Sequence, residues 1–143
     1  MKINILILHG PNLNLIGNIS SQIGQKITLS KINTNIRRHI RNKEFQLKII
    51  QTHKGFQAIN FIQRNRNWAD FLLFTPMAWA HYEYTILDTI KISNIKTIQI
   101  LFSKEFSDLT KLNSIFTKLC NTTLMGSPDV VYLEGLDYIQ KNI

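Results

Sequence analysis

Short apolar runs of strand length alternate with amphipathic segments along this chain, and this alternation restricts the fold more than any other feature. Apolar runs occupy residues 5–8, 45–51, 70–74, 97–102 and 124–125. Between them, apolar positions recur every three to four residues over 29–40, 55–67 and 81–92, as in amphipathic helices. Alternating strands and helices indicate an α/β protein with a parallel sheet. We therefore expect a flavodoxin-like three-layer sandwich, with a five-stranded parallel sheet in the order 2-1-3-4-5.

Polar residues follow the ends of several of these runs. The first run ends in His9-Gly10-Pro11-Asn12, and further polar segments lie at 75–81 and at Ser103. In an open parallel sheet, ligands bind beyond the carboxyl ends of the strands, near the point where the strand order reverses. The sequence therefore predicts a site where these three segments converge.

Several residues in these segments have side chains suited to chemistry. Asn12 can offer an amide to an oxyanion, and His81 can bind a carboxylate or move a proton. Asp88 follows His81 by seven residues, so we expect both on one face of the third helix. Structural alternatives stay open, because Asn12 can form a turn, His81 can cap a helix and Asp88 can pair with Lys91.

The ends of some elements carry local signals. Thr28 is expected to cap the helix over 29–40, and Ser127-Pro128-Asp129 to start the last helix. The Asn-, Ser- and Gln-rich segment 18–26 predicts a mobile loop. The segment 104–119 is ambiguous, with helical spacing from Leu109 through Leu112 to Phe116.

The chain carries a net charge of +8, and the excess of Lys and Arg is concentrated between residues 26 and 66. Such a region could hold an anionic substrate or a nucleic acid. The basic residues are not interleaved with aromatic residues that could stack on bases, and Ile, Asn and Lys are frequent throughout. We therefore favour compositional drift over nucleic-acid binding.

Composition sets further expectations. With 143 residues, the chain has the length of one domain, and we assign residues 1–143 to it. No segment has the apolar length of a membrane span, and no histidine, cysteine or carboxylate spacing suggests a metal site. A single cysteine, Cys120, cannot form an internal disulfide and is expected to be a half-buried structural residue. The start lacks the zones of a signal peptide, so a cytoplasmic protein is expected.

Two motifs resemble those of type II 3-dehydroquinate dehydratase, the small flavodoxin-like enzyme of the shikimate pathway. The first is L-H-G-P-N-L-N-L-I-G at 8–17. The second is T-P-M-A-W-A-H at 75–81, similar to N-P-G-A-[YF]-T-H in the family, and Asp88 follows at the family spacing. Ser103 after a strand and Gly126 before a helix containing Tyr132 extend the resemblance over nearly the whole chain.

The resemblance implies an anti elimination of water from 3-dehydroquinate through an enolate, without any cofactor. In that family a loop tyrosine removes the proton, an arginine of the same loop takes part, and a histidine after the fourth strand protonates the leaving hydroxyl. The first-loop asparagine, here Asn12, orders a water at the enolate oxygen. Substrate-binding positions are then assigned to Thr75, His81, Asp88, Phe102 and Ser103. Family members form trimers assembled into dodecamers, which implies a homo-oligomer in which the Asp88 position reaches a neighbouring site.

Several of the family's functional residues are replaced in this sequence. Ile23 stands where the loop tyrosine is expected, and segment 18–24 contains no arginine. Gln99 and Leu101 replace an acidic residue and the proton-donating histidine, and Thr75 replaces an asparagine. The sequence therefore predicts a divergent dehydratase with impaired activity. The alternatives are an inactive relative retained as a binding or structural subunit and, less favoured, a basic nucleic-acid-binding module.

Overall fold

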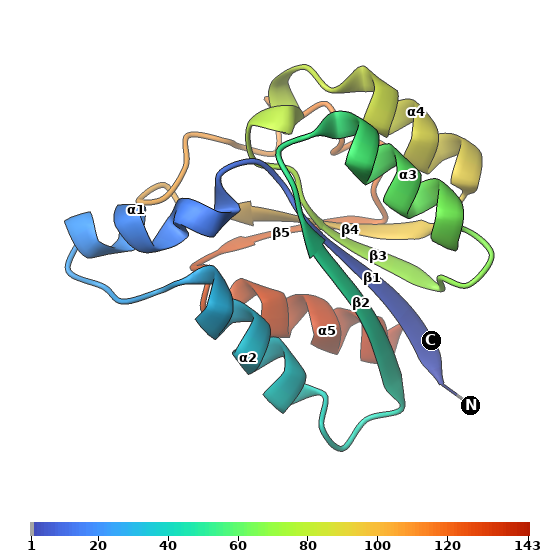
Figure 1. The fold of residues 1–143 in the computed structure, drawn as a ribbon, viewed down its shortest axis with the longest axis horizontal. Coiled ribbons are helices and arrows are strands. Elements are labelled where there is room, and N and C mark those ends of the chain that lie inside the picture. The colour runs from blue at the N-terminus through green and yellow to red at the C-terminus, as the bar shows by residue number, and fades with distance from the viewer. Residues whose placement is uncertain (1) are drawn as a thin grey trace.

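The sheet has the predicted topology. The computed structural model describes residues 2–143 and contains one sheet of five parallel strands in the order β2-β1-β3-β4-β5 (Figure 1). The strands are β1 (Ile3–His9), β2 (Phe45–Gln51), β3 (Phe71–Thr75), β4 (Lys96–Phe102) and β5 (Thr122–Gly126). The helices are α1 (Ile16–Gln22), α2 (Leu29–His39), α3 (Gly55–Asn65), α4 (Tyr84–Ser93) and α5 (Val131–Lys141), and η1 (Leu13–Leu15) and η2 (Met77–His81) are short 3₁₀ helices. The predicted flavodoxin-like fold is confirmed.

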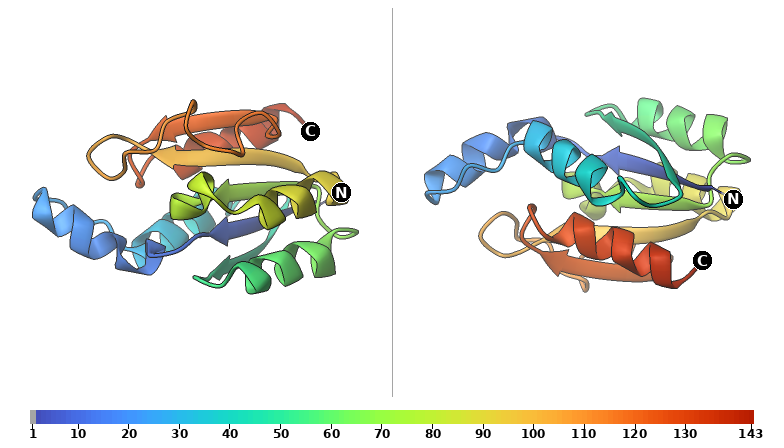
Figure 2. Two further views of the ribbon diagram at one scale, coloured as in Figure 1. Left: turned by 90° about the horizontal axis from the view of Figure 1, so that it is seen from above. Right: turned by 90° about the horizontal axis from the view of Figure 1, so that it is seen from below.

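Helices cover both faces of the sheet. α2 and α5 lie on one face and α3 and α4 on the other, as Figures 1 and 2 show. Side chains of β1 alternate between the two layers: Ile5 and Ile7 pack toward α2 and α5, and Leu6 and Leu8 pack toward α3 and α4. All four are fully buried. Burial on both faces explains why this strand is a continuous apolar run in the sequence.

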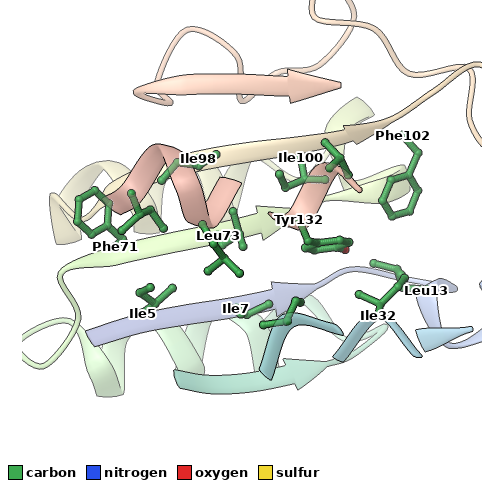
Figure 3. Packing of buried hydrophobic residues seen from close by; sticks show 14 of the residues in the cluster. Ile5, Ile7, Leu13, Ile32, Phe71, Leu73, Ile98, Ile100, Phe102 and Tyr132 are labelled. Carbon is green, nitrogen blue, oxygen red and sulfur yellow. The ribbon is translucent and has the colours of Figure 1, made fainter. Parts of the chain in front are cut away.

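The core on the α2 and α5 side reaches the carboxyl ends of the strands. Ile7, Leu73 and Ile100 come from neighbouring strands. Phe102 and Tyr132 pack in the same cluster, toward the carboxyl ends of the strands (Figure 3). Tyr132 is only 1% exposed, although it carries a hydroxyl group. A buried hydroxyl needs a hydrogen-bond partner, which draws attention to the polar groups at this end of the core.

The prediction of a mobile loop at 18–26 is wrong. Residues 16–22 form α1, which projects beyond the sheet (Figure 2). Ser20 holds the returning chain in place, because its Oγ accepts a hydrogen bond from the Ile27 N–H at 2.9 Å and its carbonyl oxygen accepts one from Gln25 at 2.8 Å. Gly24 makes the turn between them with a φ of 75°, which glycine adopts without strain. The hydroxyl and carbonyl groups of Ser20 thus order a segment whose composition favours a loop.

Helix starts agree with the sequence for α2 and for α3, which begins at Gly55, and they differ for α4 and α5. Thr28 caps α2 as predicted, and its hydroxyl accepts a hydrogen bond from the Lys31 N–H at 3.2 Å. α4 begins at Tyr84 instead of residue 81, because the chain first winds through η2. α5 begins at Val131, because residues 127–130 form a turn in which the Ser127 carbonyl accepts hydrogen bonds from Val130 and Val131.

The ambiguous segment between β4 and β5 consists of turns. Leu109 and Phe116 are buried, but Leu112 is 99% exposed, so the three do not share a helix face. The buried amide of Gln99 anchors the segment, since its Nε2 donates to Thr117 Oγ1 at 3.0 Å and to Thr123 Oγ1 at 2.9 Å. The Ser114 hydroxyl donates to the side-chain oxygen Oε1 of Gln99, so both ends of this buried amide are hydrogen-bonded. Side-chain hydrogen bonds from the sheet therefore replace a helix here.

Cys120 lies near the end of this segment and is half-buried, as expected. Burial raises the pKa of its thiol to about 12. The thiolate, which is the reactive form, is therefore strongly disfavoured.

Candidate active site at the carboxyl ends of the strands

The loop after β1 is held tightly against the end of β3. Gly10 donates a hydrogen bond from its N–H to the Thr75 carbonyl at 2.9 Å. A Cβ atom at Gly10 would lie 2.5 Å from the Pro76 carbonyl oxygen, so no other residue fits without moving the backbone. Gln51, at the end of β2, donates from Nε2 to the Gly10 carbonyl at 3.0 Å. Groups from both neighbouring strands thus fix the loop.

Asn12 is exposed at the tip of this loop. Its φ of 66° places it in the left-handed region, which asparagine tolerates better than most residues. The Asn12 N–H donates to Nδ1 of His53 at 3.2 Å. Within residues 2–143 the Asn12 side-chain amide makes no hydrogen bond, so it is available to a ligand. The turn role and the ligand-binding role considered for Asn12 are therefore compatible.

A buried polar chain lies directly beneath the loop. Nε2 of His9 lies 2.9 Å from Asn33 Oδ1, Nδ1 of His9 lies 3.1 Å from the Tyr132 hydroxyl, and that hydroxyl lies 2.7 Å from Thr75 Oγ1. Because an amide oxygen only accepts, Nε2 carries the His9 proton, Tyr132 donates to Nδ1 and Thr75 donates to Tyr132. Each of the two hydroxyl groups and both ring nitrogens of this polar chain therefore have a hydrogen-bond partner.

Burial is the main cause of the pKa shifts of His9 and Tyr132 in this polar chain. His9 is fully buried, and this lowers its pKa from 6.5 to about 4, although the hydrogen bond to Asn33 acts in the opposite direction. Burial likewise raises the pKa of Tyr132, partly offset by the hydrogen bond from Thr75. Both groups are thus neutral near pH 7. Thr75, proposed as a substrate-binding residue, is only 1% exposed and has its hydroxyl engaged in this chain.

His81 and Asp88 do not share a helix face, and that prediction is wrong. His81 is the last residue of η2 and is exposed, whereas Asp88 lies within α4, which begins three residues later. Asp88 is also exposed and lines a hollow of about 340 Å³ together with Gln63 of α3 and Arg66, which follows α3 directly. It makes no ion pair with Lys91 among the described residues. Asp88 therefore belongs to the outer face of the α3–α4 layer.

The end of β4 is apolar where proton transfer was expected from the family pattern. Leu101 is 1% exposed and packs into the core on the α3 and α4 side. Phe102, also 1% exposed, packs edge-on against Tyr132, with ring centroids 6.1 Å apart. Ser103 is half-buried, and its N–H donates to the Gly126 carbonyl at 2.9 Å. Of the β4 end, the Ser103 hydroxyl is the polar group near the surface.

Other hollows and charged groups lie elsewhere on the molecule. A hollow of about 300 Å³ is lined by Ile3, Phe71 and Lys96, at the amino ends of the strands. Across residues 2–143 no group of three or more His, Cys, Asp or Glu side chains could hold a metal ion. None of the helices in this range has the apolar length needed to cross a membrane.

The structure adds His53 to the residues predicted for this end of the sheet, and it links His9 at the end of β1 to Tyr132 of α5. His53 follows β2 directly and so lies at the same edge as Asn12, a placement that the convergence of parallel strand ends could have indicated. His9 and Tyr132 are separated by 123 positions, and no local pattern links them.

An open parallel sheet of this order, with a glycine-dependent polar loop at its reversal point, defines the class of flavodoxin-like α/β proteins. The family described as dehydroquinase class II matches residues 3–140 of the chain. This chain therefore belongs to the class II dehydroquinase family.

Individual relatives agree with this assignment. A 3-dehydroquinate dehydratase from Clostridium botulinum (strain Hall) is 26% identical over 141 residues, covering 98% of this chain and 96% of the relative. One from Dictyoglomus turgidum is 33% identical over 101 residues, covering 71% and 70%. The crystal structure of the type II dehydroquinase from Butyrivibrio crossotus superimposes with a TM-score of 0.84 at 24% identity, covering 97% of this chain and 98% of that chain. This structural likeness shows the same fold.

Proposed function

We propose that this protein binds 3-dehydroquinate and dehydrates it to 3-dehydroshikimate much more slowly than a dehydratase with a complete set of proton-transfer groups. Family membership and the names of the relatives support the substrate. The observation that carries the low rate is Leu101, which is buried and apolar at the end of β4. A hydrocarbon side chain cannot donate a proton to a departing hydroxyl.

The expected loss of rate follows from the absence of the general acid and the general base. Each positioned acid or base contributes typically about 10² to 10⁴ in rate. Ile23, at the end of α1, and Leu101 occupy the positions assigned to these two roles by the resemblance. The two effects do not add in full, but removal of both is expected to lower kcat by about 10⁴ or more. Asn12 retains an unengaged amide, so binding is expected to survive better than turnover.

The test measures binding and turnover on the same purified protein. Titration calorimetry with 3-dehydroquinate reports binding, and the absorbance of the conjugated enone product reports turnover. The relative from Clostridium botulinum, assayed in parallel, provides the reference rate. We expect measurable binding with a rate about 10⁴ below the reference or lower. A rate equal to the reference would refute the proposed impairment, and lack of binding would refute the proposed substrate.

Asn12→Ala tests the contribution of the first loop. This variant removes the free amide and is expected to weaken binding by about tenfold, the value of one hydrogen bond to a charged group. Asn67→Ala is the matched control, because Asn67 is exposed just after α3. An unchanged affinity of Asn12→Ala for 3-dehydroquinate would show that the Asn12 amide does not bind the ligand.

We further propose that copies of this chain associate through the outer face of the α3–α4 layer. Phe56 on α3 is 61% exposed, and Tyr84 and Ile92 on α4 are 62% and 76% exposed. Tyr84 and Ile92 are eight residues apart and lie on one side of α4, with Asp88 between them. Large apolar side chains grouped on one face are typical of association surfaces. Self-association agrees both with the assembly implied by the family resemblance and with the alternative in which the protein acts as a structural subunit.

Sedimentation velocity tests this association. We expect an assembled species for the wild type and a shift toward monomer for Ile92→Asp. Val130→Asp is the control, since Val130 is an exposed apolar residue at the start of α5, which covers the other face of the sheet. A wild type that sediments only as a monomer would refute the association.

A further inference from the structure

The contact between Asn12 and His53 joins the loop after β1 to the loop after β2. His53 lies between the end of β2 and the start of α3 and is exposed, as is Asn12. Its Nδ1 lies 3.2 Å from the Asn12 backbone nitrogen, which is a donor. This contact brings an imidazole ring to the tip of the loop that carries the candidate site.

The backbone donor determines which nitrogen of the His53 ring carries a hydrogen. An N–H can donate only to a ring nitrogen with a free lone pair, so Nδ1 is unprotonated in this arrangement. The hydrogen of the neutral ring then resides on Nε2. Within the described residues Nε2 has no hydrogen-bond partner, so it presents an unused donor to the surface.

The chain on both sides of His53 is fixed. The Thr52 N–H donates to the His9 carbonyl at 3.2 Å, and the Lys54 N–H donates to Thr52 Oγ1 at 3.0 Å. Gln51 holds the facing loop through the Gly10 carbonyl. The backbone that carries the imidazole is therefore held independently of Asn12, and the contact with Asn12 orients the ring.

We propose that Nε2–H of His53 and the side-chain amide of Asn12 together form a donor pair that binds one oxygen of an anionic substrate. The ligand class follows from the chemistry, because both groups can donate and the adjacent Lys54 adds positive charge. The oxygen that suits such a pair is one that gains negative charge, as in an enolate. The identity of the substrate rests on the function proposed above, whereas the tautomer of the His53 ring rests on its contact with Asn12. His53 contributes a hydrogen bond and transfers no proton.

The first experiment needs no substrate. Long-range ¹H–¹⁵N correlation spectra of the ¹⁵N-labelled protein at about pH 8 report which ring nitrogen of each histidine is protonated. We expect His53 as the Nε2–H tautomer, assigned by the loss of its signals in His53→Phe. A protein in which His53 carries its hydrogen on Nδ1 would overturn the inference, because the contact with Asn12 could then not form.

The second experiment measures the dissociation constant for 3-dehydroquinate by titration calorimetry. His53→Phe keeps a ring but removes both nitrogens, and is expected to weaken binding by about tenfold or more. His39→Phe is the control, because His39 pairs with Asp137 between α2 and α5, away from this loop. Equal affinities of wild type and His53→Phe would overturn the inference while leaving the proposed function intact. A wild type without affinity would overturn the proposed function and the binding of this substrate by the donor pair. The first experiment would still decide which nitrogen of His53 carries the hydrogen.

Discussion

Acidification is expected to destabilise the fold through His9, which is buried in its neutral form. In the unfolded chain a histidine takes up a proton with a pKa near 6.5, whereas burial lowers the folded-state pKa of His9 to about 4. Between these values the unfolded state binds more protons than the folded state, so stability is present above pH 6.5 and is lost as the pH falls toward 4. With these pKa values, the free energy of unfolding falls by about 2 kcal/mol between pH 8 and pH 5 from this residue alone.

The measurement is the difference between wild type and His9→Gln in urea unfolding, followed at about pH 8 and about pH 5. Carboxylates also begin to titrate over this range, but they contribute equally to both proteins and cancel in the difference. At pH 8 His9→Gln is expected to be less stable by about 1 to 3 kcal/mol, because partners in the polar chain lose their hydrogen bonds. At pH 5 this gap should shrink by about 2 kcal/mol. A gap that stays constant or widens on acidification would refute the assignment of a neutral, buried His9.

Three further predictions concern the packing around the site. Gly10→Ala would place a Cβ 2.5 Å from the Pro76 carbonyl oxygen, and should lower the free energy of unfolding by at least about 2 kcal/mol in urea titrations. Ser20→Ala leaves the buried N–H of Ile27 without its acceptor, so it should cost about 1 to 3 kcal/mol and accelerate amide exchange in α1; unchanged exchange would contradict the role of Ser20. Cys120, with a thiol pKa near 12, should react with iodoacetamide at pH 8 much more slowly in the native protein than after denaturation.

The sheet could be predicted from the sequence because its signal is local and repeated. Ile5 to Leu8 are buried on both faces, so the strand shows up as an unbroken apolar run. The Thr28 cap could also be predicted, since the hydroxyl and its donor are three residues apart. Strand order then followed from general rules for α/β sheets and from the family resemblance.

Predictions failed where individual hydrogen bonds, which leave no periodic pattern in the sequence, decide the local structure. Segment 18–26 has the composition of a loop, yet the bonds of Ser20 to Gln25 and Ile27 order it. The helix predicted from residue 81 starts later because η2 comes first, and the Ala80 carbonyl accepts a hydrogen bond from Ile115 at 2.9 Å. Such pairings carry no periodic signal.

The candidate site was predicted in part. Asn12 lies at the expected strand end with a free amide, whereas the Thr75 hydroxyl faces inward to Tyr132. His53 lies outside the three polar segments from which the sequence predicts the site. The rule that parallel strands end at one edge of the sheet applies to β2 as well, and it places His53 beside Asn12.

The polar chain beneath the loop has a consequence for biosynthesis. Tyr132 lies on α5, which is synthesised after all five strands, and its partner His9 precedes it by 123 residues. Until α5 has emerged and docked, Nδ1 of His9 and the Thr75 hydroxyl lack the partner that joins them. The carboxyl end of β1 thus acquires its final hydrogen bonds only after α5 has been made, and a nascent chain that stalls before Tyr132 cannot complete this end of the sheet.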